Sequence, residues 1–361
     1  MRTITIGIDL AKSLFSVCEL DSSGRVAQRR DLRREPFGQW LAQVPQGTVV
    51  AMEACSGAHH WGRRCLDAGL QPRLMAAQFV SPFRKRQVAK NDRNDAEAIA
   101  IAASQGSMRF VPVKTLEQQA RLAEHRVREG YKVEGLAVSN RWRGVLAEFG
   151  VAIPHSDAAL RRTLANLSEW PIPQRLQTLL LDLQQHWHHL GEQRAACDAR
   201  IAANAKADAR CQRLQRMIGV GPLTADALVA TIGNGTDFKN GRQLAAWLGL
   251  TPAQHSSGGK ARLGRITRRG DSYLRTLLIQ GARSSLQRAQ ATPRERATPE
   301  QIWIRDLASR LPFGKVLVAI ANKHARQAWA MLARGEDYDP NAWLKHPMVQ
   351  RPANKRRAAT E

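Results

Sequence analysis

The sequence is short of acidic residues and of long apolar runs, and both shortages narrow the classes of protein that it can encode. Only 31 Asp and Glu residues stand against 55 Lys and Arg residues, so the 361-residue chain has a formal net charge of +24. No apolar run approaches the roughly 20 residues of a membrane-spanning helix, and residues 1–12 lack the features of a signal peptide. Because the basic residues are spread along the chain, nucleic acid is favoured as the partner over an anionic membrane surface.

The cysteines offer no pairing pattern. They form no Cys-x-x-Cys pair and their number is odd, which argues against a structural zinc site and favours a reducing cytoplasm. Cys55 lies close to Glu53, but no histidine partner is evident for a thiol nucleophile, so we expect Cys55 to be a small packed residue. The five cysteines are Cys18, Cys55, Cys65, Cys197 and Cys211.

The N-terminal part predicts a sheet with helices. Ile4, Ile6 and Ile8 alternate onto one face of a strand over residues 3–9, which places Asp9 on the other face. The further elements expected here are strands over 14–20, 25–30 and 49–53, and helices over about 59–70 and from about 94 onward.

The middle of the chain predicts long basic helices. Residues 117–149 have a helical pattern, which Gly130 and Gly135 weaken by about 1 kcal/mol each, and Pro154 and residues 171–173 interrupt any continuous helix. Beyond them an apolar seam of alternating three- and four-residue steps predicts either a coiled-coil-like pair or dimer contact, or a long helix packed within its own chain. The seam consists of Leu176, Leu180, Leu183, Trp187, Leu190, Cys197 and Ile201.

The last helical region carries two candidate nucleic-acid-binding features. Gly219 and Gly221 form a Gly-x-Gly-Pro turn typical of a helix-hairpin-helix, in which backbone N–H groups bind a phosphate. A Ser256-Ser257-Gly-Gly loop precedes a dense basic stretch, which could hold a phosphate while a serine attacks it, although such a loop is just as often a turn. Tyr273 is a competing nucleophile. The basic residues taken as nucleic-acid-binding are Lys260, Arg262, Arg265, Arg268 and Arg269 here, and Arg121, Arg128 and Arg143 in the middle helix.

Four acidic residues occupy strand and helix ends. Asp9 and Glu53 end predicted strands, and Asp92 and Asp95 share one face of a helix start. Taken singly, each acid is an ordinary cap or surface residue. A cluster of four carboxylates would be strongly repulsive without divalent cations, and Mg²⁺ favours carboxylate, water and phosphate ligands. Together the four acids favour a metal site for phosphodiester chemistry.

A set of motifs lies in order between about residue 3 and residue 338. They are GIDLAKSLF, AMEACSGAHHW, KNDRNDAEAI, RFVPVK, GVGPLTADALVATIG, AAWLGLTPAQHSSGGKARLGRITRRGDSYLRTLLIQGAR and ANKHARQAWAMLARGEDY. Through these motifs the chain resembles the bridge-RNA-guided DEDD transposases of bacterial insertion sequences. These are serine-dependent recombinases related to the Piv-type DNA invertases.

The resemblance implies a fold and its domains. The expected fold is an α/β RNase H-like (RuvC-like) domain, a coiled-coil helical segment and a mainly α C-terminal domain with a helix-hairpin-helix. The corresponding ranges are 1–150 with the trailing basic helix, 151–207, 208–335, and a basic, disordered tail over 336–361.

The resemblance also implies a chemistry. Asp9, Glu53, Asp92 and Asp95 match the family's ligands for Mg²⁺, with Mn²⁺ as a substitute, and Ser257 matches its serine nucleophile. In that family the serine becomes covalently linked to DNA, and the metal site comes from a partner subunit of a dimer or tetramer. A structured bridge RNA pairs with double-stranded target and donor DNA, and the protein acts in the bacterial cytoplasm at the nucleoid.

Two other functions remain open on the residues alone. A metal-dependent nuclease of the junction-resolving type would use activated water at the acids and would need no serine. A non-catalytic nucleic-acid-binding regulator would need neither the acids nor the serine, and the strand and helix contexts of the acids argue against it.

Overall fold

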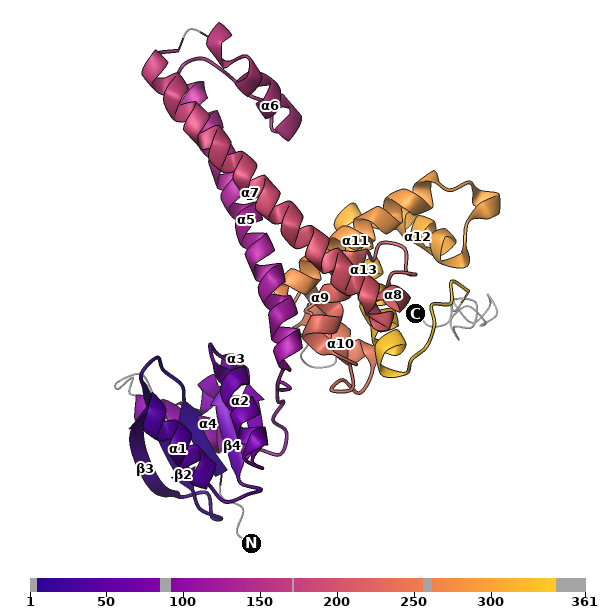
Figure 1. Cartoon of the computed structure of the whole chain (residues 1–361). Coiled ribbons are helices and arrows are strands. Elements are labelled where there is room, and N and C mark those ends of the chain that lie inside the picture. The colour runs from indigo at the N-terminus through magenta and orange to yellow at the C-terminus, as the bar shows by residue number, and fades with distance from the viewer. Residues whose placement is uncertain (1–4, 85–91, 171, 256–261, 342–361) are drawn as a thin grey trace. The chain divides into compact units, whose positions relative to one another are not determined.

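The computed structural model describes residues 5–84, 92–170, 172–255 and 262–341 (Figure 1). The chain divides into two compact units, Met1–Leu116 and Glu117–Glu361, so the long basic helix belongs to the second unit. Within the described residues, no helix is both long and apolar enough to cross a membrane.

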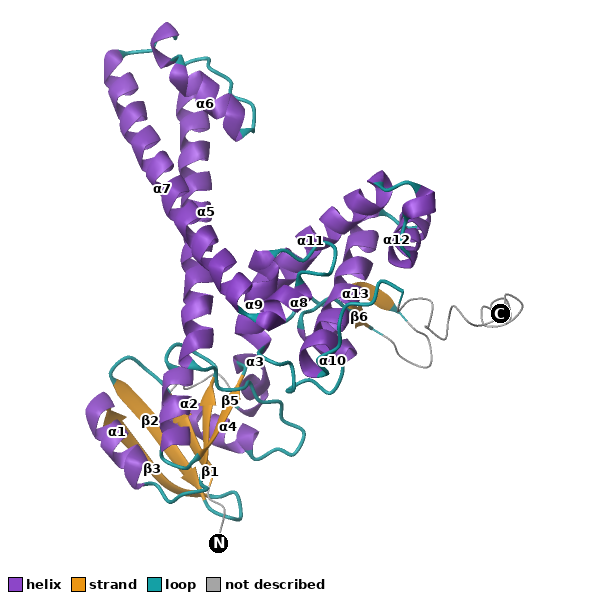
Figure 2. Cartoon of the chain, turned by 45° about the vertical axis from the view of Figure 1, so that its right-hand side comes forward, coloured by secondary structure: helices purple, strands orange, loops and turns teal. Residues whose placement is uncertain are grey.

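The N-terminal unit contains a five-stranded mixed sheet, which confirms the four predicted strands and adds a fifth, β5, that the sequence did not predict (Figure 2). The strand order is β3-β2-β1-β4-β5, in which β1, β2 and β3 are antiparallel neighbours while β4 and β5 run parallel to β1. The strands are β1 (Thr5–Asp9), β2 (Leu14–Leu20), β3 (Val26–Arg33), β4 (Val49–Glu53) and β5 (Gln71–Met75).

Helices cover both faces of this sheet. Ile6 and Ile8 pack with Phe37 of α1 and Trp61 of α2, in a core where the rings of Phe37 and Trp61 meet edge to face at 4.7 Å. Ala51 of β4 faces the other way and packs with α4. The alternation of the isoleucines therefore predicted the two faces correctly. The helices are α1 (Arg34–Gln43), α2 (Ala58–Asp67), α3 (Ala77–Val80), η1 (Ser81–Phe83) and α4 (Asp92–Ala103).

The second unit begins with two long helices that lie side by side (Figures 1 and 2). The predicted weakening at Gly130 and Gly135 does not end the helix: α5 is continuous through both. Val138, Trp142 and Leu146 of α5 pack on the α7 seam, and this tertiary packing outweighs the low helix propensity of two glycines. The seam therefore packs within its own chain, with Leu176, Leu183 and Trp187 partly buried, and a coiled-coil dimer stays a prediction. The helices are α5 (Leu116–Ala147), α6 (Asp157–Ala165), η2 (Leu167–Glu169) and α7 (Gln174–Ala207).

The rest of the second unit is mainly helical, as expected, with one two-stranded hairpin. A single large core unites its helices.

The start of the C-terminal tail is ordered. Asp337 pairs with Arg216 at 2.9 Å, and the Tyr338 hydroxyl donates to Glu300, so the expected disorder of the tail is wrong for these first residues. Residues 342–361 lie outside the described part. The elements are α8 (Ala209–Leu214), α9 (Pro222–Ile232), α10 (Gly241–Trp247), β6 (Pro252–Gln254), β7 (Leu263–Ile266), α11 (Ser272–Ala291), η3 (Arg294–Arg296), α12 (Pro299–Arg310) and α13 (Phe313–Ala333).

Candidate active site

The register of two parallel strands brings the first pair of acids together. Ile8 of β1 pairs with Met52 of β4, so Asp9 and Glu53 follow side by side at the ends of the two strands. Side chains alternate along a strand, and Ile8 and Met52 both belong to the core under α1 and α2. Asp9 and Glu53 therefore point to the opposite face of the sheet, the face that α4 covers.

Helix α4 supplies the second pair of acids from its first turn, which contains Asp92 and Asp95. The helix lies unusually close to β1 because Gly7 has no side chain. A Cβ atom at Gly7 would stand 2.2 Å from the carbonyl oxygen of Ala96 and 2.5 Å from the amide nitrogen of Ala100. Asp92 lies one turn before Ala96 and Asp95 directly before it, so both acids are close enough to the end of β1 to act on the charge of Asp9.

The close approach of α4 to Gly7 gives a first prediction. A Gly7→Ala variant must push α4 away from the sheet, since the added methyl group meets helix backbone rather than a side chain that can rotate. We expect a loss of roughly 2 kcal/mol or more in the free energy of unfolding. Urea denaturation measures this loss. Gly38→Ala is the control, because only one atom, 3.9 Å away, comes near its added Cβ; an equal effect of the two changes would contradict the interpretation.

The charges of the four acids act on one another. The pKa of Asp9 is raised from 3.8 to about 6, first by burial and then by repulsion from Asp95, Asp92 and Glu53, while Arg84 acts in the opposite direction. Repulsion of this kind means that the predicted set does converge in the folded unit.

Cys55 lies nearby and is exposed, so its expected role as a packed residue is wrong.

An arginine that the sequence did not single out lies among the acids. Arg84 Nη2 is 2.7 Å from Glu53 Oε1, and its Nε is 3.2 Å from Asp95 Oδ1. Within the described residues, no group of three or more His, Cys, Asp or Glu side chains is arranged to hold a metal ion in this conformation. The donor set itself suits a hard cation, because carboxylate oxygens are the ligands that Mg²⁺ and Mn²⁺ prefer. Binding an ion would require these carboxylates to rearrange.

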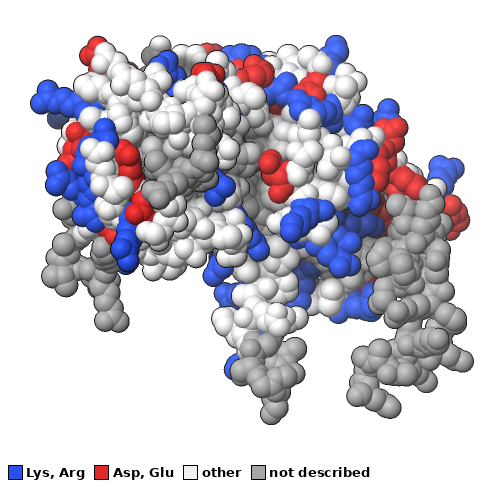
Figure 3. Space-filling view, turned by 90° about the horizontal axis from the view of Figure 1, so that it is seen from below, with Lys and Arg blue, Asp and Glu red and all other residues white. Residues whose placement is uncertain are grey.

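The proposed serine lies outside the described residues. Strands β6 and β7 form an antiparallel hairpin whose connection includes residues 256–261, and therefore Ser256, Ser257 and Lys260. The basic residues on the described side of that connection, Arg262, Arg265, Arg268 and Arg269, are exposed. Basic side chains are also visible in several groups over the face shown in Figure 3, which agrees with their spread along the sequence.

The Gly-x-Gly-Pro turn joins α8 to α9, as predicted. Gly219 has a φ of +88°, and a Cβ there would stand 2.3 Å from the carbonyl oxygen of Gly281 in α11. Gly219 is therefore required for packing, whatever it binds. Gly221 precedes α9, and no side chain caps the N-terminus of that helix. Phosphate binding by this turn stays a prediction.

Two of the three arginines predicted to bind nucleic acid from the middle helix are engaged within the chain. Arg121 lies 3.0 Å from Asp208 and its side chain is only 12% exposed, and Arg128, 14% exposed, pairs with Asp198. Because these guanidinium groups are paired and largely buried, they are not part of the interface proposed below. Arg143 is half-buried, and two of its nitrogen atoms have no hydrogen-bond partner.

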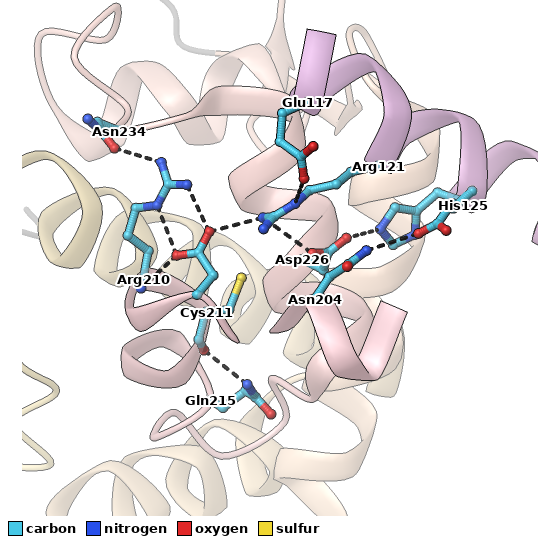
Figure 4. Close-up of polar contacts among 11 residues, drawn as sticks. Glu117, Arg121, His125, Asn204, Arg210, Cys211, Gln215, Asp226 and Asn234 are labelled. Atoms are coloured by element: carbon cyan, nitrogen blue, oxygen red, sulfur yellow. Dashed lines mark hydrogen bonds and ion pairs between the residues drawn. The ribbon is translucent and has the colours of Figure 1, made fainter. Parts of the chain in front are cut away.

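Arg121 belongs to a buried polar network that the sequence did not reveal (Figure 4). His125 Nε2 lies 3.0 Å from Asp226 Oδ2, and His125 Nδ1 lies 3.0 Å from the Tyr273 hydroxyl. Burial raises the pKa of Tyr273 to about 12, which makes it a poor nucleophile at neutral pH. The available signal was Asp226 itself, an acid inside the apolar stretch of α9.

Comparisons with known proteins agree with the motifs. A transposase model of the IS110 DEDD type matches residues 6–150, and the model described as "Transposase IS116/IS110/IS902 family" matches residues 211–298. The chain is 42% identical to a probable family 20 transposase of Pseudomonas aeruginosa, over 94% of this chain and 100% of the relative. It is 38% identical to the transposase for insertion sequence element IS1111A of Coxiella burnetii, over 94% of this chain and 92% of the relative. It is 37% identical to the transposase for IS1328 of Yersinia enterocolitica, over 91% and 97% respectively. The chain therefore belongs to the IS116/IS110/IS902 family of insertion-sequence transposases, enzymes that cut and rejoin DNA.

Proposed function

We propose that this transposase cuts and rejoins DNA through a covalent link between Ser257 and a DNA phosphate. The Ser257 oxygen would form a bond to phosphorus as the bond from phosphorus to the leaving deoxyribose oxygen breaks. The serine would lose its proton and the leaving oxygen would gain one. The phosphoester is thereby conserved, so a DNA hydroxyl group can attack it in turn and restore a continuous strand.

The single observation that carries this proposal is the convergence of Asp9, Glu53, Asp92 and Asp95 from two strands and a helix of one compact unit. Mg²⁺ or Mn²⁺ held there would stabilise charge on the scissile phosphate and the leaving oxygen. The exposed basic residues of β7 and the segment after it would bind the DNA backbone next to Ser257.

The partners proposed are double-stranded target and donor DNA and a structured bridge RNA that selects them. The net charge of +24 supports a polyanionic partner but does not distinguish RNA from DNA. We further propose a dimer or tetramer in which the acids of one subunit act with Ser257 of another. Sequencing the nucleic acid that co-purifies with the protein tests whether a guide RNA is bound. Recombination by protein freed of RNA would contradict the guide.

The test of the chemistry is to trap the covalent intermediate. We expect the wild-type protein, with Mg²⁺, its RNA and a DNA carrying the ends of the element, to form a protein–DNA adduct that survives denaturation. Ser257→Ala should form none and should still bind DNA and RNA, because only one hydroxyl group is removed. Ser256→Ala is the matched control and should form the adduct normally.

The same experiment separates the proposal from the metal-dependent nuclease that also fits the acids. A nuclease that activates water cleaves DNA without any adduct, and its cleavage would continue in Ser257→Ala. Such continued cleavage would remove the serine from the mechanism and leave the acidic site as the whole active centre.

A further inference from the structure

Arg84 lies among the carboxylates of the acidic site and contacts two of them through two nitrogen atoms of its guanidinium group. Its Nη2 donates to Glu53 and its Nε lies within ion-pair distance of Asp95, so one side chain joins the end of β4 to the first turn of α4. Its charge also acts through space on Asp9. The two carboxylates that it holds are two of the four proposed metal ligands.

A guanidinium group and a divalent ion compete for these oxygens. Arg84 places one positive charge among four carboxylates, whereas a bound Mg²⁺ would place two positive charges in the same volume. Like charges a few ångströms apart repel strongly in a partly buried site, and each carboxylate oxygen that coordinates a metal ion is no longer free to accept from Arg84.

We propose that Arg84 is a built-in counter-ion of the acidic site: it neutralises Glu53 and Asp95 when no divalent ion is bound, and it must release both for the ion to enter. This inference rests on the proposed function, since it assigns a role to Arg84 only if the acids bind metal. It also accounts for the conformation described above, in which the acids converge without a group of three arranged as ligands among the described residues.

The exposure of Arg84 makes the exchange reversible. Its side chain is 39% exposed, so it can turn toward solvent without leaving a buried charge behind. Ion pairs with this much exposure contribute little to stability, and Mg²⁺ gains further ligands from a DNA phosphate. The site would therefore bind a divalent ion weakly in the free protein and more tightly once DNA is bound. Tight metal binding would thus be limited to the DNA complex.

The experiment measures Mn²⁺ binding to the full-length protein without DNA, by electron paramagnetic resonance of the free ion. We expect Arg84→Gln to bind Mn²⁺ roughly tenfold more tightly than the wild type, because the ion no longer displaces a resident cation. The Mn²⁺ affinity of Arg84→Lys should lie between the two, since an ammonium group keeps the charge but loses the planar pair of donors that contacts both carboxylates. When Mn²⁺ is added after chelator, Arg84→Gln should gain more thermal stability than the wild type.

Arg25→Gln is the matched control. It removes the same charge from the same unit, but far from the acidic site. Arg25 lies in the turn after β2, and the end of β2 at Leu20 pairs with Thr5, which is at the opposite end of β1 from Asp9. It should bind Mn²⁺ like the wild type. Equal Mn²⁺ affinities of wild type, Arg84→Gln and Arg25→Gln, all abolished by Asp9→Asn, would overturn the role of Arg84 and leave the metal site intact. Mn²⁺ binding that Asp9→Asn does not change would overturn the metal site and this inference together.

Discussion

Replacing Asp9 with Asn should abolish DNA cleavage and at the same time stabilise the metal-free protein. The change removes one of four proposed ligands and one negative charge, while the shape of the side chain is kept. The loss of transition-state stabilisation should be several kcal/mol, or roughly 10³-fold or more in rate. DNA cleavage at saturating Mg²⁺ measures this effect, with DNA binding as the control for folding.

The gain in stability follows from the pKa of Asp9. Folding raises that pKa from 3.8 to about 6, mainly through burial. Between these two values the folded chain binds more protons than the unfolded chain, so the contribution of Asp9 to stability falls as the pH rises from about 4 to about 6. Above pH 6 the penalty is fully present, and asparagine removes it.

The size of this gain is modest, on the order of 1 kcal/mol, because Asp9 is only half-buried and solvent screens its charge. Thermal unfolding in chelator at pH 7.5 and at pH 4 should show the gain at the higher pH only. Asp67→Asn, at an exposed position ending α2, is the matched control and should change neither activity nor stability. If Asp9→Asn cleaved DNA normally, or melted earlier than the wild type at pH 7.5, the acidic site would have to be reassigned.

The sequence predicted this site because the information lies in short-range patterns. Alternation at Ile6 and Ile8 gives the face of Asp9, and an apolar run that ends at Glu53 gives a strand end. The carboxyl ends of parallel neighbouring strands meet at one edge of a sheet, so two acids that end such strands can form one group. The spacing of Asp92 and Asp95 places both on one face of a helix start, and the family motifs agree with that set of four.

The rest of the site depends on contacts that leave no periodic signal. Arg84 lies 31 residues from Glu53, and nothing in its local sequence separates it from the other 54 Lys and Arg residues. The continuity of α5 was also missed, because helix propensity at Gly130 and Gly135 says nothing of the packing that α7 provides. For Arg121 and Arg128, charge alone suggested a nucleic-acid interface, whereas their partners Asp208 and Asp198 come from other parts of the chain.

Replacing Asp226 with Ala should destabilise the C-terminal unit by about 3–5 kcal/mol. The Asp226 side chain is fully buried, with Oδ2 3.0 Å from His125 Nε2 and Oδ1 3.4 Å from Arg121 Nη1. With its Nε2–H donated to Asp226, His125 can accept at Nδ1 from the Tyr273 hydroxyl. The Asp226 carboxylate therefore fixes the direction of the hydrogen bonds that connect α9, α5 and α11. Without Asp226, Arg121 keeps its ion pairs with Asp208 and Glu117 among the described residues, and His125 loses its buried acceptor.

Asp198→Ala provides the matched comparison for Asp226→Ala. Asp198 also pairs with an arginine of α5, Arg128, but its side chain is 42% exposed, so water replaces the lost partner. We expect this change to cost less than about 1 kcal/mol. Urea denaturation followed by tryptophan fluorescence gives both values, and Tyr273→Phe should fall between them because it removes one hydroxyl group and no charge. Equal midpoints for Asp226→Ala and Asp198→Ala would show that the buried network does not hold α5, α9 and α11 together, since burial is the property in which the two aspartates differ most.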